Sequence, residues 1–182
     1  MVKIYLGGLR PLPPENQPTG IFKREQHGPV WLGREGLAGD AQGDRRVHGG
    51  IEKALHQYPV EHYARLAAAF PQAAALLVRG SNGENLSIDG WNEANVCIGD
   101  VFRLGGARIQ VSQPRSPCWK IDRRYGVTGM TQTIGEQGLT GWYFRVVEEG
   151  EVGPGCVFEL LEHDAAATTV AAAFAAKRKI HL

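Results

Sequence analysis

Hydrophobic residues occur along this chain in short runs separated by turn-forming residues. The sequence contains 24 glycines and 10 prolines, which divide the apolar positions into brief segments. Short apolar runs between such residues are typical of β-strands and unlike the long amphipathic stretches of a helix bundle. We therefore expect strands at Val2–Leu6, Gly20–Lys23, Val30–Leu32, Ala107–Ser112, Trp142–Val147 and Val157–Leu161.

The clearest two-residue alternation lies in the strand expected at 107–112. Its apolar residues share one face and its polar residues share the other, since successive side chains of a strand point to opposite sides. The apolar face consists of Ala107, Ile109 and Val111. Another apolar segment, Val96–Leu104, precedes this strand, and two glycines separate them. This arrangement predicts a β-hairpin.

Helical patterns are fewer than strand patterns. Residues 59–70 place Tyr63, Leu66 and Phe70 on one helical face. Shorter helices are expected at Gln72–Leu77, Thr131–Gln137 and Val170–Lys177, the last with Thr168 or Thr169 as its N-cap. Many short strands with few helices predict a mainly β (α+β) fold, a closed or nearly closed β-barrel with short peripheral helices.

Size and charge narrow the classes of function. The chain has 182 residues, which is the size of one domain, and its 20 basic residues nearly balance 19 acidic ones. A net charge of +1 gives no electrostatic basis for nucleic acid or an anionic membrane as the main partner. The N-terminus lacks a secretory signal pattern, and no apolar run is long enough to span a bilayer. We therefore expect a cytoplasmic protein.

Three cysteines, Cys97, Cys118 and Cys156, are widely spaced and odd in number, which argues against a disulfide framework. The sequence has no CxxC, and its six histidines lack the spacing of common zinc motifs, so a zinc site is not expected. Cys97 lies inside a strand-like segment and Cys156 adjoins one, so both are expected in the core or the sheet. Any cysteine chemistry would then belong to one thiol.

The segment Ser112–Lys120, SQPRSPCWK, is the strongest candidate for that chemistry. Two prolines stiffen the chain before Cys118, and the residues after it can begin a helical turn whose dipole favours an anion. Arg115 and Lys120 add nearby positive charge. These features favour a thiolate, a soft ligand for a transition metal. The alternative is that Cys118 is a small buried hydrophobic residue, as most free cysteines are.

Two glycine-containing clusters lie upstream. GLAGDAQ and VHGGIEKAL contain closely spaced glycines that let backbone N–H groups approach an anion, and Lys53 adds a positive charge. A tight turn with a solvated lysine explains the same pattern. His48 is likewise either a ligand or an ordinary turn residue. In the later GEN turn, Asn85 offers both a donor and an acceptor to a heterocycle, although ordinary turn chemistry would also account for it.

Taken in order, GLAGDAQ, VHGGIEKAL, GENLS, IGDVFRLGGARIQVSQPRSPCWK and GWYFRV closely resemble the MOSC domain family, most strongly its YiiM-like branch. The resemblance extends from about Tyr5 to Leu161. HGGxxKAL and SQPRSPCxK are specific in combination, whereas either motif alone would be much weaker. The resemblance implies a MOSC domain over residues 1–165, followed by a short helical tail over 166–182.

The resemblance implies a β-barrel-like domain related to the C-terminal domain of molybdenum cofactor sulfurases. Characterised relatives include molybdenum-dependent reductases of N-hydroxylated compounds, such as hydroxylaminopurines and amidoximes. Cys118 matches their protein ligand to molybdenum. The positions matched to binding of the molybdenum cofactor (molybdopterin) are His48, Gly49, Lys53, Asn85, Arg115 and Lys120. Asp40 and Gln42 are weaker candidates that shape the loop, and His48 is also a candidate proton donor.

The sequence contains no evident flavin, haem or iron–sulfur module, so this resemblance implies electrons from a separate reductase. In two places the chain departs from the branch. Asn82 stands where phenylalanine usually precedes Gly-Glu-Asn, and the helical C-terminal extension of the branch is not present before Leu182. We expect any role of that extension in docking an electron donor to be reduced.

Two other functions use the same residues. In one, the domain only carries the cofactor, or a sulfur group on Cys118, without reducing a substrate. In the other, Cys118 and His48 form a cysteine–histidine hydrolase, which lacks an identifiable residue to orient the histidine.

Overall fold

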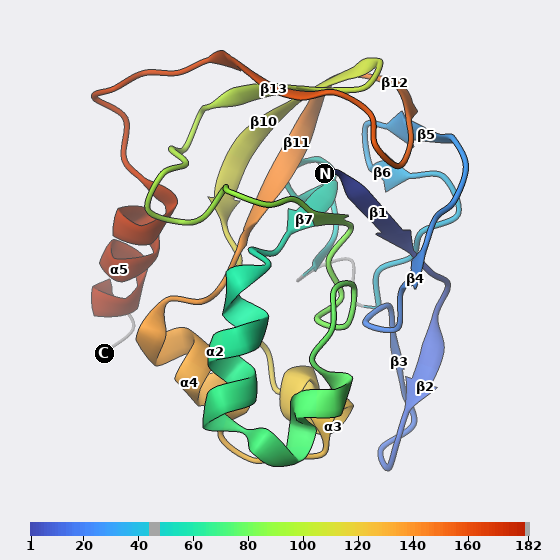
Figure 1. Ribbon diagram of the computed structural model, residues 1–182, viewed down its shortest axis with the longest axis vertical. Coiled ribbons are helices and arrows are strands. Elements are labelled where there is room, and N and C mark those ends of the chain that lie inside the picture. The colour runs from blue at the N-terminus through green and yellow to red at the C-terminus, as the bar shows by residue number, and fades with distance from the viewer. Residues whose placement is uncertain (44–47, 181–182) are drawn as a thin grey trace.

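The computed structural model describes residues 1–43 and 48–180 (Figure 1). The fold is mixed α+β and strand-rich, with a strongly curled half-barrel sheet and short helices. This confirms the predicted fold class. No helix in these two ranges has the length and apolar character needed to cross a membrane.

The half-barrel is an eight-stranded sheet in which segments from both ends of the chain meet. Its strands are, in spatial order, β13 (Phe158–Glu162), β9 (Val101–Leu104), β10 (Ala107–Pro114), β11 (Trp142–Glu148), β7 (Leu55–Gln57), β8 (Leu86–Ser87), β1 (Lys3–Leu6) and β4 (Arg24–Glu25). Neighbouring strands are antiparallel except β7 and β8, which pair in parallel. The sheet therefore brings the ends of β7, β8 and β10 close together.

Smaller elements surround this sheet. One three-stranded sheet contains β12 (Gly150–Val152), β5 (Val30–Gly33) and β6 (Gly36–Leu37), and a two-stranded ribbon contains β2 (Arg10–Leu12) and β3 (Gln17–Thr19). The helices are η1 (Ile51–Lys53), α2 (Glu61–Ala69), η2 (Pro71–Leu76), α3 (Lys120–Tyr125), α4 (Met130–Gln137) and α5 (Val170–Ile180). Figure 1 shows α2, α3 and α4 gathered beyond one end of the large sheet.

Two apolar clusters stabilise this arrangement. The first lies on the inner face of the half-barrel and includes Ile109, Phe144 and Val170. The second packs the helices together and includes Leu66, Ile121 and Ile134. Burial of such side chains from water is the main favourable contribution to folding. Because Val170 belongs to the first cluster, α5 is attached to the barrel core.

The predicted hairpin is confirmed, but its first strand is shorter than expected. β9 begins at Val101, and residues 97–100 form a turn in which the Asp100 carboxylate accepts a hydrogen bond from the Cys97 N–H at 2.8 Å. This side-chain bond competes with strand pairing, so the strand begins only after the turn. The alternation in β10 is confirmed, since Ala107, Ile109 and Val111 are fully buried.

The prediction of a strand at Gly20–Lys23 is wrong. Strands form on either side, as β3 and β4, and the segment between them is irregular. The hydroxyl of Thr19 accepts a hydrogen bond from the Ile21 N–H at 3.2 Å, and a Cβ atom at Gly20 would collide with the Ala41 carbonyl. A local turn and close packing on a second loop therefore replace strand pairing here.

The other predicted elements form with small shifts in their ends. The segment expected to be helical at Gln72–Leu77 is a 3₁₀ helix over Pro71–Leu76. The N-cap prediction for the last helix is confirmed at Thr169, whose hydroxyl accepts a hydrogen bond from the Ala172 N–H at 3.1 Å. The division between residues 1–165 and 166–182 stays a prediction.

Candidate functional site

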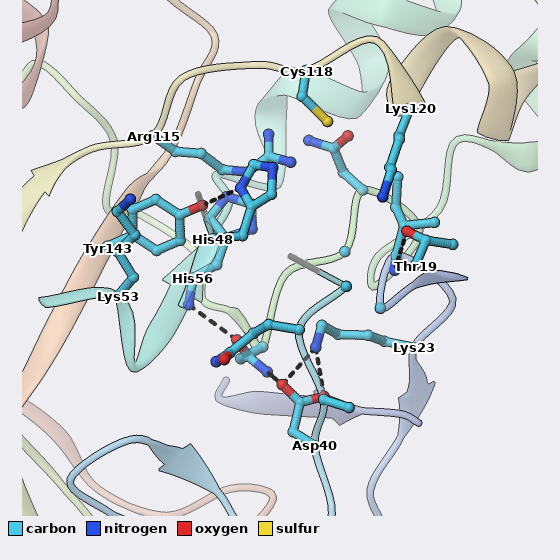
Figure 2. Close-up of a pocket in the computed structure, with 18 residues that line it drawn as sticks. Thr19, Lys23, Asp40, His48, Lys53, His56, Arg115, Cys118, Lys120 and Tyr143 are labelled. Carbon is cyan, nitrogen blue, oxygen red and sulfur yellow. Dashed lines mark hydrogen bonds and ion pairs between the residues drawn. The ribbon is translucent and has the colours of Figure 1, made fainter. Parts of the chain in front are cut away.

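A solvent-open cleft of about 590 Å³ lies where the three sequence clusters meet (Figure 2). This volume includes space that is open to solvent. The predicted residues that line it are Asp40, Gln42, His48, Lys53, Asn85, Arg115, Cys118 and Lys120. Gly49 is not among the lining residues. Residues as far apart in the sequence as Thr19 and Tyr143 thus form one site.

Cys118 lies in the irregular segment between β10 and α3. The Cys118 carbonyl accepts hydrogen bonds from the Ile121 N–H at 3.0 Å and the Thr131 hydroxyl at 3.2 Å. These two bonds fix the backbone, while the half-buried side chain lines the cleft. Figure 2 shows its sulfur pointing inward, with Arg115 on one side and Lys120 on the other. Neither of the other two cysteines belongs to the cleft lining.

Lys23 and Asp40 form a buried ion pair in the wall of the cleft. The Lys23 Nζ lies 2.5 and 2.6 Å from the two carboxylate oxygens. Burial lowers the pKa of Lys23, and the adjacent Asp40 carboxylate opposes that shift. Asp40 also accepts a hydrogen bond from the Gly7 N–H at 2.9 Å. Asp40 therefore connects three chain segments, as a loop-shaping residue should.

Asn85 contributes to the same network. Its Nδ2 donates to Asp40 at 2.8 Å and to the Tyr5 carbonyl at 3.2 Å, while its Oδ1 accepts from the His56 N–H at 3.1 Å. The amide is thus engaged on both sides with protein groups. The structure brings Asn85 to the cleft, where it holds the wall together.

The GEN turn contains a second buried carboxylate, that of Glu84. It accepts hydrogen bonds from the Tyr63 hydroxyl at 2.5 Å, the Gly80 N–H at 2.6 Å and the Asn82 N–H at 3.1 Å. Burial raises the pKa of Glu84, and these donors oppose the shift. Glu84 therefore folds the turn that presents Asn82 and Asn85 to the cleft.

Several buried polar atoms of the cleft lack hydrogen-bond partners among the described residues. They are Nη1 of Arg115 and both amide atoms of Asn82. Arg115 is 6% exposed and Asn82 is 1% exposed. An unsatisfied buried polar group costs about 1–3 kcal/mol, so a concentration of such groups at one cleft indicates a ligand that bonds to them.

Tyr143 lies between Arg115 and the HGG segment. Its hydroxyl is 3.2 Å from Nδ1 of His48. Burial raises the pKa of Tyr143, and Arg115 opposes this shift, so the phenol is protonated at neutral pH. Burial, followed by the charge of Arg115, lowers the pKa of His56 well below its usual value. His56 is therefore a neutral imidazole.

The 3₁₀ helix η1 positions Lys53 at the cleft. The Ser112 hydroxyl donates to the Glu52 carbonyl at 2.6 Å, and the Arg145 guanidinium lies 3.0 Å from the Glu52 carboxylate. These contacts fix η1 against β10 and β11. The segment 44–47, which joins the two predicted loop clusters, lies outside the described residues.

The described lining of the cleft is strongly cationic. It contains Lys23, Lys53, Arg115 and Lys120 but a single carboxylate, that of Asp40. Lys120 Nζ also donates to the Pro18 carbonyl at 3.0 Å, which connects α3 to the β2–β3 ribbon. Asp40 is paired with Lys23, whereas Arg115 and Lys120 add positive charge on the side of Cys118. This balance suits an anionic ligand.

Sequence patterns did not identify Thr19, Lys23, His56 or Tyr143 as lining residues. Tyr143 lies on the face of its strand opposite Trp142 and Phe144. This alternation was the one signal in the sequence that could have indicated its position. Lys23 closes an apolar segment that was expected to pair as a strand. Only the three-dimensional arrangement brings it to Asp40.

This half-barrel, with a thiol in a cationic cleft, matches one family of domains. A profile of the MOSC domain matches residues 44–159, and the chain belongs to this family. It is YiiM-like: protein YiiM of Escherichia coli (strain K12) is 42% identical over 160 residues, which cover 88% of this chain and 71% of the relative. The crystal structure of YiiM from Escherichia coli superimposes with a TM-score of 0.79 over 96% of this chain and 74% of that one, at 37% identity.

Two other relatives extend the comparison. The uncharacterized protein YflK of Bacillus subtilis (strain 168) is 48% identical over 143 residues, 79% of this chain and 63% of the relative. A protein of Gibberella moniliformis named "Reductase" is 36% identical over 145 residues. That match covers 79% of this chain but 26% of the relative, so the present chain corresponds to about a quarter of it. The resemblance in the sequence motifs is thereby confirmed at the level of family and branch.

Proposed function

We propose that this chain is a molybdenum cofactor-dependent reductase of N-hydroxylated compounds, such as hydroxylaminopurines and amidoximes. The MOSC domain is generally linked to the molybdenum cofactor, and one relative is named a reductase. The observation that carries the proposal is the position of Cys118, whose sulfur points into a cleft between Arg115 and Lys120, where buried polar atoms of Arg115 and Asn82 lack partners among the described residues. An anionic cofactor with a thiophilic metal requires this combination.

The residues of the cleft fit the cofactor. Cys118 would provide the sulfur ligand to molybdenum, and Arg115, Lys53 and Lys120 would hold the anionic part of the group. The amide of Asn82 offers a donor and an acceptor to the heterocycle. When bound, the cofactor would supply the two-electron chemistry that converts an N–OH group to N–H and water. Gly49 and Asn85 stay predicted binding positions.

The His48–Tyr143 pair is suited to proton delivery. The Tyr143 hydroxyl and Nδ1 of His48 form a hydrogen bond at 3.2 Å, in which the donor depends on the tautomer of His48. We assign to His48 the role of proton donor to the departing oxygen. Tyr143 acts through His48 and is a positioning residue. Because His56 is neutral, it adds no positive charge next to Tyr143.

A complete turnover also requires two partners. The substrate is a small N-hydroxylated molecule that enters the open side of the cleft, and the electrons come from a separate reductase. Neither a nucleic acid nor a membrane is required for this reaction.

The test combines cofactor analysis with activity. Protein expressed in a host that makes the molybdenum cofactor should contain molybdenum and pterin, and should reduce a hydroxylaminopurine when a reductase system supplies electrons. Cys118→Ala should lose this activity, whereas Cys156→Ala, a matched change outside the cleft, should keep it. Full activity of cofactor-loaded Cys118→Ala would refute the proposal. Protein without molybdenum or reductase activity but with a persulfide on Cys118 would instead support a sulfur carrier.

A further inference from the structure

A second cluster of metal-binding side chain types lies outside the cleft. It consists of Cys97, Asp100 and His163, and their ligand atoms all lie within 4.8 Å of one another. Nδ1 of His163 is 2.8 Å from the Asp100 carboxylate. None of the three residues is part of the cleft lining. They bring a thiol, a carboxylate and an imidazole to one point.

The pairing of β13 with β9 creates this meeting point. In that register Glu162 lies opposite Val101, so the next residue outward on each strand is His163 on one side and Asp100 on the other. Cys97 joins them through the turn at 97–100, where its carbonyl accepts a hydrogen bond from the Asp100 N–H at 3.1 Å. Strand register and turn geometry together fix the three residues.

The C-terminal segment holds the same turn from the other side. Cys97 forms an isolated β-bridge with Thr169, and the Ile98 N–H donates to the Thr168 carbonyl at 2.9 Å. His163 itself lies in the connection between β13 and α5. A ligand at the cluster would therefore tie this connection to the start of β9.

Burial and charge at the cluster favour a cation. Asp100 is 1% exposed and Cys97 is 6% exposed. The His163 side chain is 39% exposed, which leaves a route for an ion and a position for water. Burial, with the nearby carboxylates Asp100 and Asp164, raises the pKa of the Cys97 thiol. The negative charges that disfavour a bare thiolate attract a metal ion, which would in turn stabilise the thiolate.

We propose that Cys97, Asp100 and His163 form a binding site for one Zn²⁺ ion. A mixed sulfur, nitrogen and oxygen set suits Zn²⁺, whereas Mg²⁺ and Ca²⁺ prefer oxygen ligands alone. Three protein ligands leave the fourth tetrahedral position to water. Binding converts the Cys97 thiol to a thiolate and releases its proton to solvent. The site is separate from the cleft and does not depend on the proposed function.

Cobalt provides the test, because Co²⁺ bound by a thiolate has an intense charge-transfer band and occupies zinc sites. The full chain with Cys118→Ala, treated with a chelator, is titrated with Co²⁺ so that the thiol of the cleft does not contribute. We expect the band to saturate at one equivalent and to disappear when Zn²⁺ displaces Co²⁺. Adding Cys97→Ser should remove the band, whereas adding Cys156→Ser should leave it unchanged.

A second variant keeps the test independent of the buried cysteine. His163→Ala changes a partly exposed side chain and should weaken Zn²⁺ binding by more than about tenfold, the lower range seen when an outer-shell partner is lost. His27→Ala, a change at an exposed histidine elsewhere, should leave the affinity unchanged. Absence of the cobalt band, its persistence in Cys97→Ser, or equal Zn²⁺ affinity in His163→Ala would each overturn the proposal.

Discussion

The Lys23 ammonium lies 2.5 and 2.6 Å from the two carboxylate oxygens of Asp40, and each side chain is 5% exposed. The pair joins the segment before β4 to the loop after β6, in the wall of the cleft. Breaking one member of a buried pair leaves the other as an uncompensated charge, which is more costly than losing both.

We therefore expect Lys23→Met to reduce the free energy of unfolding by about 3–5 kcal/mol. Adding Asp40→Asn should recover part of this loss, because the neutral amide needs no counter-charge. Urea denaturation of the two variants and the wild type measures both effects. A double variant less stable than Lys23→Met would show that the pair does not act through charge compensation.

Arg115 should strengthen ligand binding and lower the stability of the ligand-free fold. Its guanidinium is buried, and Nη1 has no partner among the described residues. Arg115→Met keeps much of the side chain volume and removes the charge. We expect the cofactor-free variant to unfold at the same or a higher temperature than the wild type, and the variant from a cofactor-competent host to retain at least about tenfold less pterin. A variant that is less stable but fully loaded would assign Arg115 to the fold instead.

His56 should contribute to acid sensitivity. Its pKa in the folded protein is well below the ordinary value of 6.5, because of burial and the charge of Arg115. The unfolded chain then binds one more proton than the folded chain below about pH 6.5, so the contribution of His56 to stability is present above that pH and lost below it. The loss amounts to about 1.4 kcal/mol per pH unit.

The sign of this effect can be checked by measuring unfolding at pH 7.5 and pH 5.5 in the wild type and in His56→Gln. The variant should show a smaller fall in stability between the two values. In the wild type, the His56 ring resonances should show no titration over this range. Titration with an ordinary midpoint would contradict a neutral His56.

Sequence patterns account for part of the fold and part of the site. The alternation at 107–112 predicted the face of β10 that is buried, because a two-residue period has one structural solution. The motifs around His48, Lys53 and Cys118 predicted lining residues that do meet at one cleft. Asn85 lines the cleft too, but its amide is engaged with Asp40 and His56, which no linear pattern indicates.

Other features depend on tertiary contacts that a linear pattern does not contain. The apolar character of residues 20–23 predicted a strand, yet contact with the loop at Ala41 and the Thr19 turn prevent pairing. The spacing of Cys97, Asp100 and His163 matches no common metal motif, and the register of β13 against β9 brings them together. Such juxtapositions follow from sheet topology.

Tyr143 should affect turnover without affecting cofactor binding. Its hydroxyl faces Nδ1 of His48 at 3.2 Å, and its ring is buried against the His56 ring, 5.6 Å between centroids. Tyr143→Phe preserves the ring packing and removes the hydroxyl. We expect kcat to fall by about tenfold or more, less than the 10²–10⁴-fold contribution typical of a direct proton donor. Molybdenum content, measured in parallel, should be unchanged; a loss of metal equal to the loss of activity would assign Tyr143 to binding.

The central claim is that the sulfur of Cys118 is a ligand to molybdenum. X-ray absorption at the molybdenum edge counts sulfur neighbours directly, in the loaded wild type and in Cys118→Ala samples that retain the pterin. The predicted result is one molybdenum–sulfur neighbour fewer in Cys118→Ala than in the wild type, with no such change in Cys156→Ala. An identical number of sulfur neighbours in the wild type and Cys118→Ala would contradict the claim.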